Sequence, residues 1–348
     1  MVLSMIDVLE TFISNRDLEN VLQAYGKDRP HPLNQIASYR EDNGFAYYNT
    51  LQAIQNIIEV NPGWLKRISY RLVNVDDFAE ASSALGEVRA YGYLLGAGVQ
   101  VEPVVEGEGP TPDFRICKSP SNVIEVEVNS KQYSEAESEA LKEFVSSASE
   151  QPASGVDFRE ICVTPFGKPG EGENIAENVI SKLASIKASE RQFTSSCISI
   201  LWLDFQDILW GLGIEAESAL PVRTGNEEFF SGELWYAFYG VEGLPIFERD
   251  SLEERAIETS VSMRHNGRFR VSTKIDACIV SFPEETVVLE NPYSNNSLPE
   301  WLSRCLAQLR NYNFALSWQT WPFDDLKDRV AAEVKRIHAL KGCGLYSW

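Results

Sequence analysis

The chain has 348 residues, of which 31 are Lys or Arg and 51 are Asp or Glu, so its net charge is −20. This charge argues against a free-standing, high-affinity DNA-binding protein, because phosphate binding depends on clustered cations. It does not exclude an enzyme that acts on DNA through a confined basic groove or through metal ions. The hydrophobic share of 44% is that of a globular protein, and no apolar run approaches the roughly 20 residues that cross a bilayer. We therefore expect a soluble, cytoplasmic protein without a membrane segment.

The first part of the chain, residues 1–75, is expected to be helical, because apolar residues recur at intervals of three and four. The predicted helices cover 5–26, 49–62 and 63–77. The last of these helices carries Lys66, Arg67 and Arg71 on one side. The segment 27–44 contains two prolines and is expected to be a loop.

From residue 76 onward, strand patterns alternate with helix patterns, which is typical of an α/β core with a mixed sheet. The predicted helices of this part are 76–98, 134–148 and 173–193, and the predicted strands are 99–105, 113–119, 122–128, 158–166, 197–205, 232–240, 268–282 and 286–292. Ser134 and Glu137 are expected to form a capping box at the start of the second helix. The chain returns to helix over 298–316 and 324–340.

Two glutamates share one face of the predicted strand 122–128. Glu125 and Glu127 are one residue apart in an apolar run, and alternate residues of a strand point to the same side. Like charges held this close in apolar surroundings repel each other and lose hydration unless a cation or a proton intervenes. Six cysteines without CxxC spacing and three scattered histidines do not suggest a zinc site. The glutamate pair therefore requires another explanation.

The order of acidic residues along the chain supplies one. A helix containing Glu87 is followed by a strand, by Pro112-Asp113, by the strand with Glu125-Val126-Glu127, and by another helix. This order resembles the PD-(D/E)XK superfamily of restriction-endonuclease-like nucleases. The motif of that family is an aspartate and then, on the next strand, an acidic residue, any residue and a lysine. Glu127 stands at the lysine position of this chain, and some members of the superfamily carry glutamate there.

The resemblance implies a restriction-endonuclease-like mixed sheet flanked by helices, with helical additions at both ends. It also implies hydrolysis of phosphodiester bonds with Mg²⁺ or Mn²⁺, since carboxylate oxygens and water suit these cations. The expected catalytic residues are Asp113, Glu125 and Glu127, and the expected metal ligands are Glu87, Asp113, Glu125 and the carbonyl of Val126. The expected substrate is DNA, in bacterial or phage-related defence or repair.

The resemblance divides the chain into an N-terminal helical region (1–75), a nuclease-like α/β core (76–292) and a C-terminal helical region (293–348). The departure at Glu127 leaves a second interpretation open. In it, the same fold has lost catalysis, and its acidic surface binds a basic protein partner in a larger complex. A third interpretation is structural, with Glu125 and Glu127 facing solvent from an edge strand.

A basic segment, RHNGRFRVSTK (264–274), surrounds a predicted turn at Asn266-Gly267. The candidate nucleic-acid contacts in it are Arg264, Arg268, Arg270 and Lys274. A solvated hairpin tip is the simpler interpretation of this segment. Asp204, at the end of the predicted strand 197–205, is expected to cap the following turn.

Overall fold

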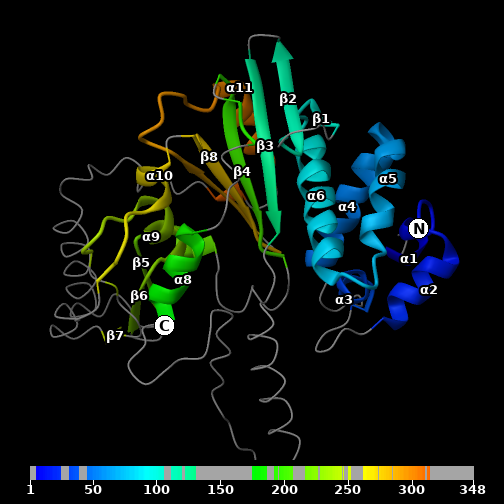
Figure 1. The fold of residues 1–348 in the computed structure, drawn as a ribbon, viewed down its shortest axis with the longest axis horizontal. Coiled ribbons are helices and arrows are strands. Elements are labelled where there is room, and N and C mark those ends of the chain that lie inside the picture. The colour runs from blue at the N-terminus through cyan, green and yellow to red at the C-terminus, as the bar shows by residue number, and fades with distance from the viewer. Residues whose placement is uncertain are drawn as a thin grey trace, which may run out of the picture.

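The computed structural model is an α/β fold in which helices cover both faces of a mixed sheet (Figure 1). The structure describes residues 5–24, 31–38, 45–105, 111–119, 122–130, 175–185, 192–194, 196–206, 216–225, 228–244, 246, 250–251, 262–272, 274–283, 285–309 and 312–313. The predicted elements 134–148, 158–166 and 324–340 lie outside these residues. Within the described part of the chain, no helix has both the length and the apolar character needed to cross a membrane.

The N-terminal part is helical, as its spacing of apolar residues predicts. Its helices are α1 (Met5–Leu9), α2 (Asn15–Gln23), α3 (Pro32–Ser38), α4 (Phe45–Val60) and α5 (Pro62–Leu72). Ser14 caps α2 by accepting a hydrogen bond from Asp17 N, and Asn61 caps α5 by accepting one from Trp64 N. The prediction of a loop over 27–44 is wrong where α3 lies, because Pro32 occupies its first position, where a helix tolerates proline.

Helix α6 (Phe78–Gly96) lies between α4 and the sheet (Figure 1). Two of its glycines allow this close packing. A Cβ atom on Gly92 would lie 2.3 Å from the carbonyl oxygen of Ala53 on α4. A Cβ atom on Gly86 would lie 1.9 Å from Oγ of Ser130 on the sheet side. Because the two glycines have no side chains, α6 can approach both α4 and the sheet more closely than larger residues would allow.

The main sheet has seven strands in the order β1-β2-β3-β4-β8-β9-β10. These strands are β1 (Val101–Pro103), β2 (Phe114–Ser119), β3 (Asn122–Ser130), β4 (Ile198–Asp204), β8 (Ala277–Ser281), β9 (Thr286–Glu290) and β10 (Tyr312–Asn313). β1, β2 and β3 pair antiparallel, whereas β4 runs parallel to both β3 and β8. β9 is antiparallel to β8, and β10 is parallel to β9. The prediction of an α/β protein with a mixed sheet is therefore confirmed.

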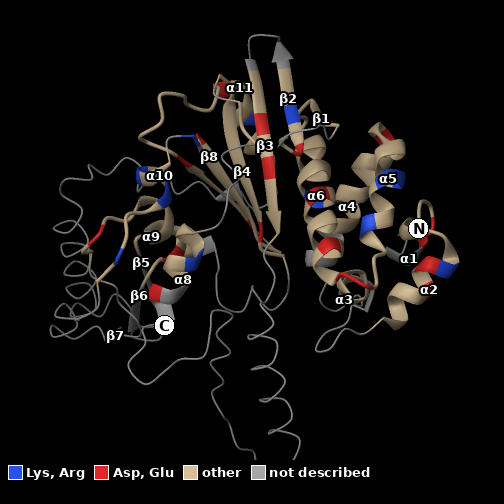
Figure 2. Ribbon diagram, viewed as in Figure 1, with Lys and Arg blue, Asp and Glu red and all other residues tan. Residues whose placement is uncertain are grey.

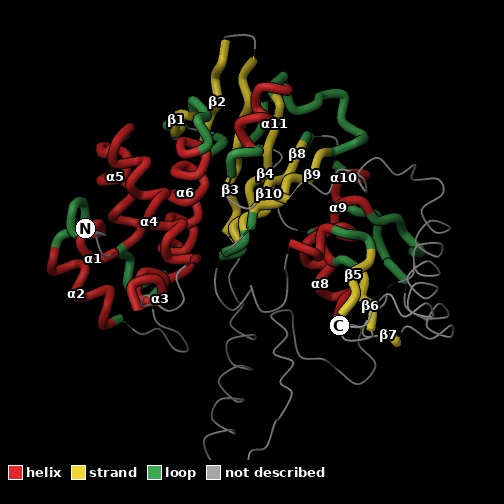
Figure 3. Tube along the Cα trace, turned by 180° about the vertical axis from the view of Figure 1, so that it is seen from behind, coloured by secondary structure: helices red, strands yellow, loops and turns green. Residues whose placement is uncertain are grey.

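Each face of the sheet has its own hydrophobic core, and strand residues alternate between the two. Ile200 and Trp202 of β4 belong to the core shared with α6 and the N-terminal helices. Leu201 and Leu203 belong to the opposite core, with α8 (Ile175–Ala184) and α9 (Glu233–Tyr239). This double burial explains why β4 is continuously apolar in sequence. Figure 3 shows the sheet from behind, with the two helical layers on either side.

The remaining described elements flank the main sheet. They are η3 (Ala216–Ala219), β5 (Val222–Gly225), β6 (Glu228–Ser231), β7 (Asp250–Ser251), α10 (Arg268–Val271) and α11 (Glu300–Leu306). β5, β6 and β7 form a small antiparallel sheet. Because α2 to α5 and α11 contribute to the same core as α6, the helical regions and the sheet pack as neighbours. The predicted domain boundaries stay a prediction.

Three sequence predictions fail in the second half of the chain. The segment 232–240, predicted as a strand, is the helix α9, whose residues are all buried. A helix that is buried on every side is apolar on every side. Its apolar residues therefore do not recur every three or four positions, and its sequence cannot be told from that of a buried strand. The predicted strand 268–282 begins with the short helix α10 and becomes strand only at β8. The predicted helix 298–316 ends as α11 at Leu306, and β10 follows.

The close contact between α4 and α6 gives a test of the packing. We expect Gly92→Ala to lower the free energy of unfolding by about 1–3 kcal/mol, because the added methyl group overlaps the backbone of Ala53. The matched control is Gly63→Ala at an exposed position of α5, where the nearest atom to an added Cβ is 3.9 Å away. There alanine should be neutral or stabilising by up to about 1 kcal/mol. Urea denaturation measures both, and equal stability of the two variants would contradict this packing.

Candidate active-site pocket

The start of β2 lies against the end of β3, and this brings Asp113 to the motif strand. Phe114 pairs with Val126, so the same antiparallel register places Asp113 beside Glu127. The Oδ2 atom of Asp113 accepts a hydrogen bond of 2.7 Å from the backbone N–H of Val128. The aspartate is thus anchored to the strand that carries the two glutamates, at the level of Glu127 and not of Glu125.

An open pocket of about 620 Å³ lies beside Asp113. Its charged and polar lining residues are Arg67, Arg71, Glu87, Thr111, Asp113 and Gln192. Helix α5 contributes the arginines, α6 contributes Glu87, and the approach to β2 contributes Asp113. The pocket therefore combines two carboxylates with two guanidinium groups, and it draws them from both the N-terminal helices and the α/β part of the chain.

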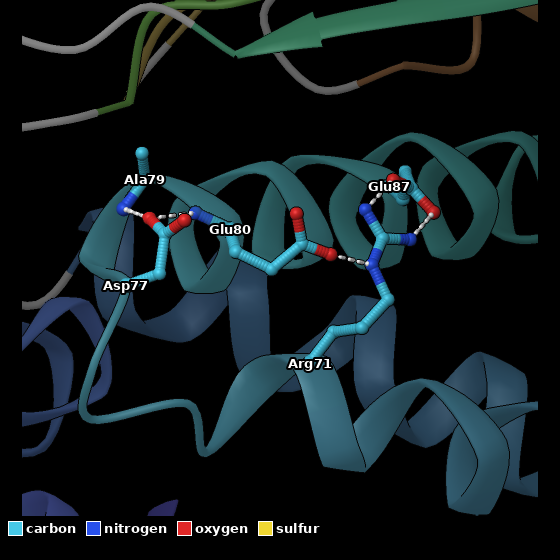
Figure 4. Close-up of polar contacts among 5 residues, drawn as sticks. All are labelled: Arg71, Asp77, Ala79, Glu80 and Glu87. Atoms are coloured by element: carbon cyan, nitrogen blue, oxygen red, sulfur yellow. Dashed lines mark hydrogen bonds and ion pairs between the residues drawn. The ribbon is translucent and has the colours of Figure 1, made fainter.

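Glu87 is held by an arginine from the neighbouring helix (Figure 4). Arg71 Nη1 donates a hydrogen bond of 2.8 Å to Oε2 of Glu87, and Nη2 lies 2.8 Å from Oε1. The Nε–H group of Arg71 also donates a hydrogen bond to Glu80, which lies in the first turn of α6. Asp77 caps α6 there by accepting hydrogen bonds from the N–H groups of Ala79 and Glu80. Arg71 thus bridges two carboxylates along one side of α6.

The pKa of Glu87 reflects its burial and its carboxylate neighbour. Burial of the side chain and the nearby charge of Asp113 raise the pKa of Glu87 to about 7, although Arg71 opposes the change. The pKa of Arg71 is also raised above its ordinary value. Its hydrogen bonds and ion pairs with Glu87 and Glu80 outweigh the effect of burial, which alone would lower this pKa. Glu87 and Asp113 therefore interact within one pocket, and a cation between them would relieve their repulsion.

Glu125 has a different environment. Its side chain is completely buried, and its Oε1 atom lies 3.0 Å from Nη2 of Arg115 on β2. Thr194, just before β4, donates its N–H to Oε2 at 2.6 Å and its hydroxyl to Oε1 at 2.9 Å. Figure 2 shows the acidic bands of β3 beside a basic band on β2. An arginine and a threonine of this chain therefore stabilise the Glu125 carboxylate.

The structure brings some of the predicted ligands together and separates others. Glu87 and Asp113 share the pocket, and Glu127, which is 8% exposed, lies beside Asp113 in the register of the sheet. Glu125 is engaged by Arg115 and Thr194 instead. The side chain of Val126 is buried in the core on the α6 side, and a role for its carbonyl stays a prediction.

A magnesium or manganese site can be tested against this donor set. Among the described residues, no group of three or more His, Cys, Asp or Glu side chains is arranged to hold a metal ion. Mg²⁺ is usually bound by one or two carboxylates, with water and substrate phosphate completing its shell. The pair of Glu87 and Asp113 fits that requirement once Arg71 releases the two oxygens of Glu87 that it holds. Glu125 does not line this pocket, and Arg115 and Thr194 bind its carboxylate.

The basic segment 264–274 lies in another part of the molecule, around α10 (Figure 1). Arg264 forms an ion pair of 2.7 Å with the buried Glu177 of α8, and Arg268 donates to the carbonyl of Ala184. Arg270 lies over the ring of Tyr293 at 5.0 Å. Lys274 is exposed, just before β8. The three arginines thus make contacts within the protein, and nucleic-acid binding by this segment stays a prediction.

In comparisons with protein-family models, curated proteins and solved structures, no family, protein or structure matches this chain significantly. A function therefore has to be inferred from the residues and their geometry.

Four contributors, Arg71, Arg115, Gln192 and Thr194, were not assigned to the site from the sequence. Arg71 is four residues after Arg67 on a predicted helix, a spacing that places both on one face. Arg115 could have been found by pairing the strands on either side of the turn, which brings it opposite Glu125. Gln192 and Thr194 carried no signal, because the segment up to residue 193 was predicted as helix.

The burial of Glu125 predicts a strong coupling with Arg115. Arg115→Met should lower the free energy of unfolding by about 1–3 kcal/mol, because it leaves a buried carboxylate without its counterion. Adding Glu125→Gln should restore most of this loss, since glutamine is uncharged and still accepts a hydrogen bond from Thr194. The measurement is urea denaturation at pH 7.

The control for this cycle is the exposed pair of Arg304 and Glu300. Arg304→Met should change stability by less than about 0.5 kcal/mol, because exposed ion pairs contribute little. If the two substitutions at Arg115 and Glu125 were simply additive, the ion pair would not be what stabilises Glu125.

Proposed function

We propose that this chain is a metal-dependent nuclease with a restriction-endonuclease-like core that hydrolyses phosphodiester bonds in DNA. The order of the described elements supports the proposal: α6 precedes three antiparallel strands, and α8 and then β4, parallel to β3, come later in the chain, after residues 131–174, which lie outside the described part. α6 and α8 belong to the cores on opposite faces of this sheet. The resemblance implies a helix, strands and a further helix in this order, but the helix predicted directly after β3, 134–148, lies outside the described residues.

The observation that carries the proposal is the shared pocket of Asp113 and Glu87. These two residues come from the two motif positions that precede β3, and their mutual repulsion favours a hard cation. When bound, such a cation would activate water and neutralise charge on the phosphate oxygens. Glu127, beside Asp113, is the carboxylate that we assign to orienting the attacking water.

The register of the sheet supports a motif shifted by two residues. Extending the pairing of Phe114 with Val126 by one residue puts Glu127 beside Asp113, so we assign Glu127 to the acidic position of the motif. Asn129, two residues later on β3, then takes the place of the lysine. An amide can donate a hydrogen bond to water but carries no charge. In this proposal Glu125 stabilises the fold through Arg115 and Thr194.

A second candidate function is that of an interaction subunit with a lapsed site. It is favoured by one observation, that both oxygens of Glu87 are bound by Arg71. In this case the net charge of −20 would bind a basic protein partner within a larger complex. Metal binding separates the two candidates, because a lapsed site whose carboxylates are neutralised by arginine has no need of a cation.

Metal binding can be measured through stability. If Glu87 and Asp113 hold a cation, millimolar Mg²⁺ or Mn²⁺ should raise the melting temperature by mass action. Asp113→Asn should abolish this increase. Without metal, the same variant should be as stable as the wild type or more so, because asparagine keeps an acceptor for Val128 N and removes repulsion of Glu87. A melting temperature of the wild type that does not respond to either metal would favour the interaction subunit.

Cleavage of a fluorescent DNA substrate tests the reassigned roles. Asp113→Asn and Glu127→Gln should each lower the rate by about 10²-fold or more, because each removes a charged group next to the reaction. Glu125→Gln should lower stability and retain cleavage in the folded protein. Asp76→Asn, at an exposed carboxylate before α6, is the matched control and should not affect cleavage. The assignment is wrong if Glu125→Gln is inactive while folded and Glu127→Gln is active.

A further inference from the structure

Helix α5 supplies two arginines to the pocket from outside the α/β part of the chain. Arg67 and Arg71 are four residues apart on α5, so they project from the same face of the helix. Both line the pocket that contains Glu87 and Asp113. Arg67 is exposed, and the side chain of Arg71 is 35% exposed. A ligand that enters the pocket can therefore reach both guanidinium groups.

Arg71 presents the donor arrangement that binds phosphate. Two of its N–H groups point to the two oxygens of Glu87, as they would to two oxygens of a phosphodiester. Figure 4 shows this fork reaching from α5 to α6. Glu87 is only 12% exposed, so its carboxylate is the more deeply placed member of the pair. Glu87 thus occupies the position on Arg71 that a phosphate would take.

The same bond blocks Glu87 as a metal ligand. A guanidinium group that contacts both carboxylate oxygens competes with a cation for them, and its positive charge repels the cation. An incoming phosphodiester removes both obstacles if Arg71 exchanges Glu87 for the phosphate. A cation that binds Glu87 and Asp113 in turn releases Arg71 for the phosphate. Each ligand therefore favours binding of the other.

Building on the proposed nuclease function, we infer that Arg71, assisted by Arg67, is the phosphate-contacting residue of this pocket. We further infer that its exchange between Glu87 and the phosphate couples nucleic-acid binding to metal binding. Linkage requires this coupling to be reciprocal. The N-terminal helices then form part of the substrate site, although the sequence resemblance places the site in the core alone.

The experiment measures Mn²⁺ binding by calorimetry, with and without a saturating DNA oligonucleotide whose phosphorothioate linkages resist cleavage. In the wild type, the oligonucleotide should tighten Mn²⁺ binding by about tenfold, within the usual range of coupling between sites. In Arg71→Ala, Mn²⁺ alone should bind more tightly than in the wild type. The oligonucleotide should then have little further effect, and its own affinity should fall by about tenfold.

Two further variants keep the test decisive. Arg71→Lys retains the charge but loses the fork, so it should bind the oligonucleotide more weakly than the wild type and serves if Arg71→Ala does not fold. Arg304→Ala removes an arginine of α11 that pairs with Glu300 on the same helix and does not line the pocket, so this variant should behave as the wild type.

The outcomes separate the inference from the function on which it rests. Wild-type protein that binds both ligands without coupling would overturn the exchange of Arg71, and the nuclease proposal would stand. Unchanged affinity of Arg71→Ala for the oligonucleotide would overturn its role in phosphate contact. Absence of Mn²⁺ binding to the wild type in both conditions would overturn the nuclease proposal itself.

Discussion

The position of helix α6 is the constraint on which the rest of this structure depends. The helix is confined between α4 and the sheet, and Gly92 and Gly86 provide the space on its two sides. A buried ion pair of 2.8 Å between Arg89 and Asp204 joins it to the end of β4. Both side chains are about 5% exposed or less, so the pair is removed from solvent. A glutamate at position 87 can therefore project into the pocket with little freedom to move.

Several buried or mostly buried carboxylates of the described residues are neutralised by arginines of the same chain. The pairs are Glu87–Arg71, Glu125–Arg115, Glu177–Arg264 and Asp204–Arg89. Removing one partner of such a pair leaves an uncompensated charge in the interior, which is costly. Because these carboxylates are paired with arginines, they do not account for the net negative charge of the sequence. Among these carboxylates, Glu87 differs because a second carboxylate, Asp113, lies close enough to raise its pKa.

Much of the fold could be predicted from the sequence because its patterns are local. The apolar spacing of α4 to α6 and the alternation in β2 and β3 identify these elements directly. Helix α9 could not be identified in this way, since burial on all sides removes the period. The pairing of Asp113 and Glu87 in one region was predicted, whereas the environment of Glu125 was not. Its partner Arg115 lies on another strand, and only the register of the sheet reveals it.

The ion pair of Arg89 and Asp204 also has a consequence for the order of folding. Its members are 115 residues apart in the chain, so the contact closes a long loop. During synthesis the N-terminal helices are complete well before β4 leaves the ribosome. Until Asp204 arrives, no carboxylate offsets the cost of burying Arg89. Because contacts of this separation slow folding, we expect docking of α6 against β4 to come late in the assembly of this protein.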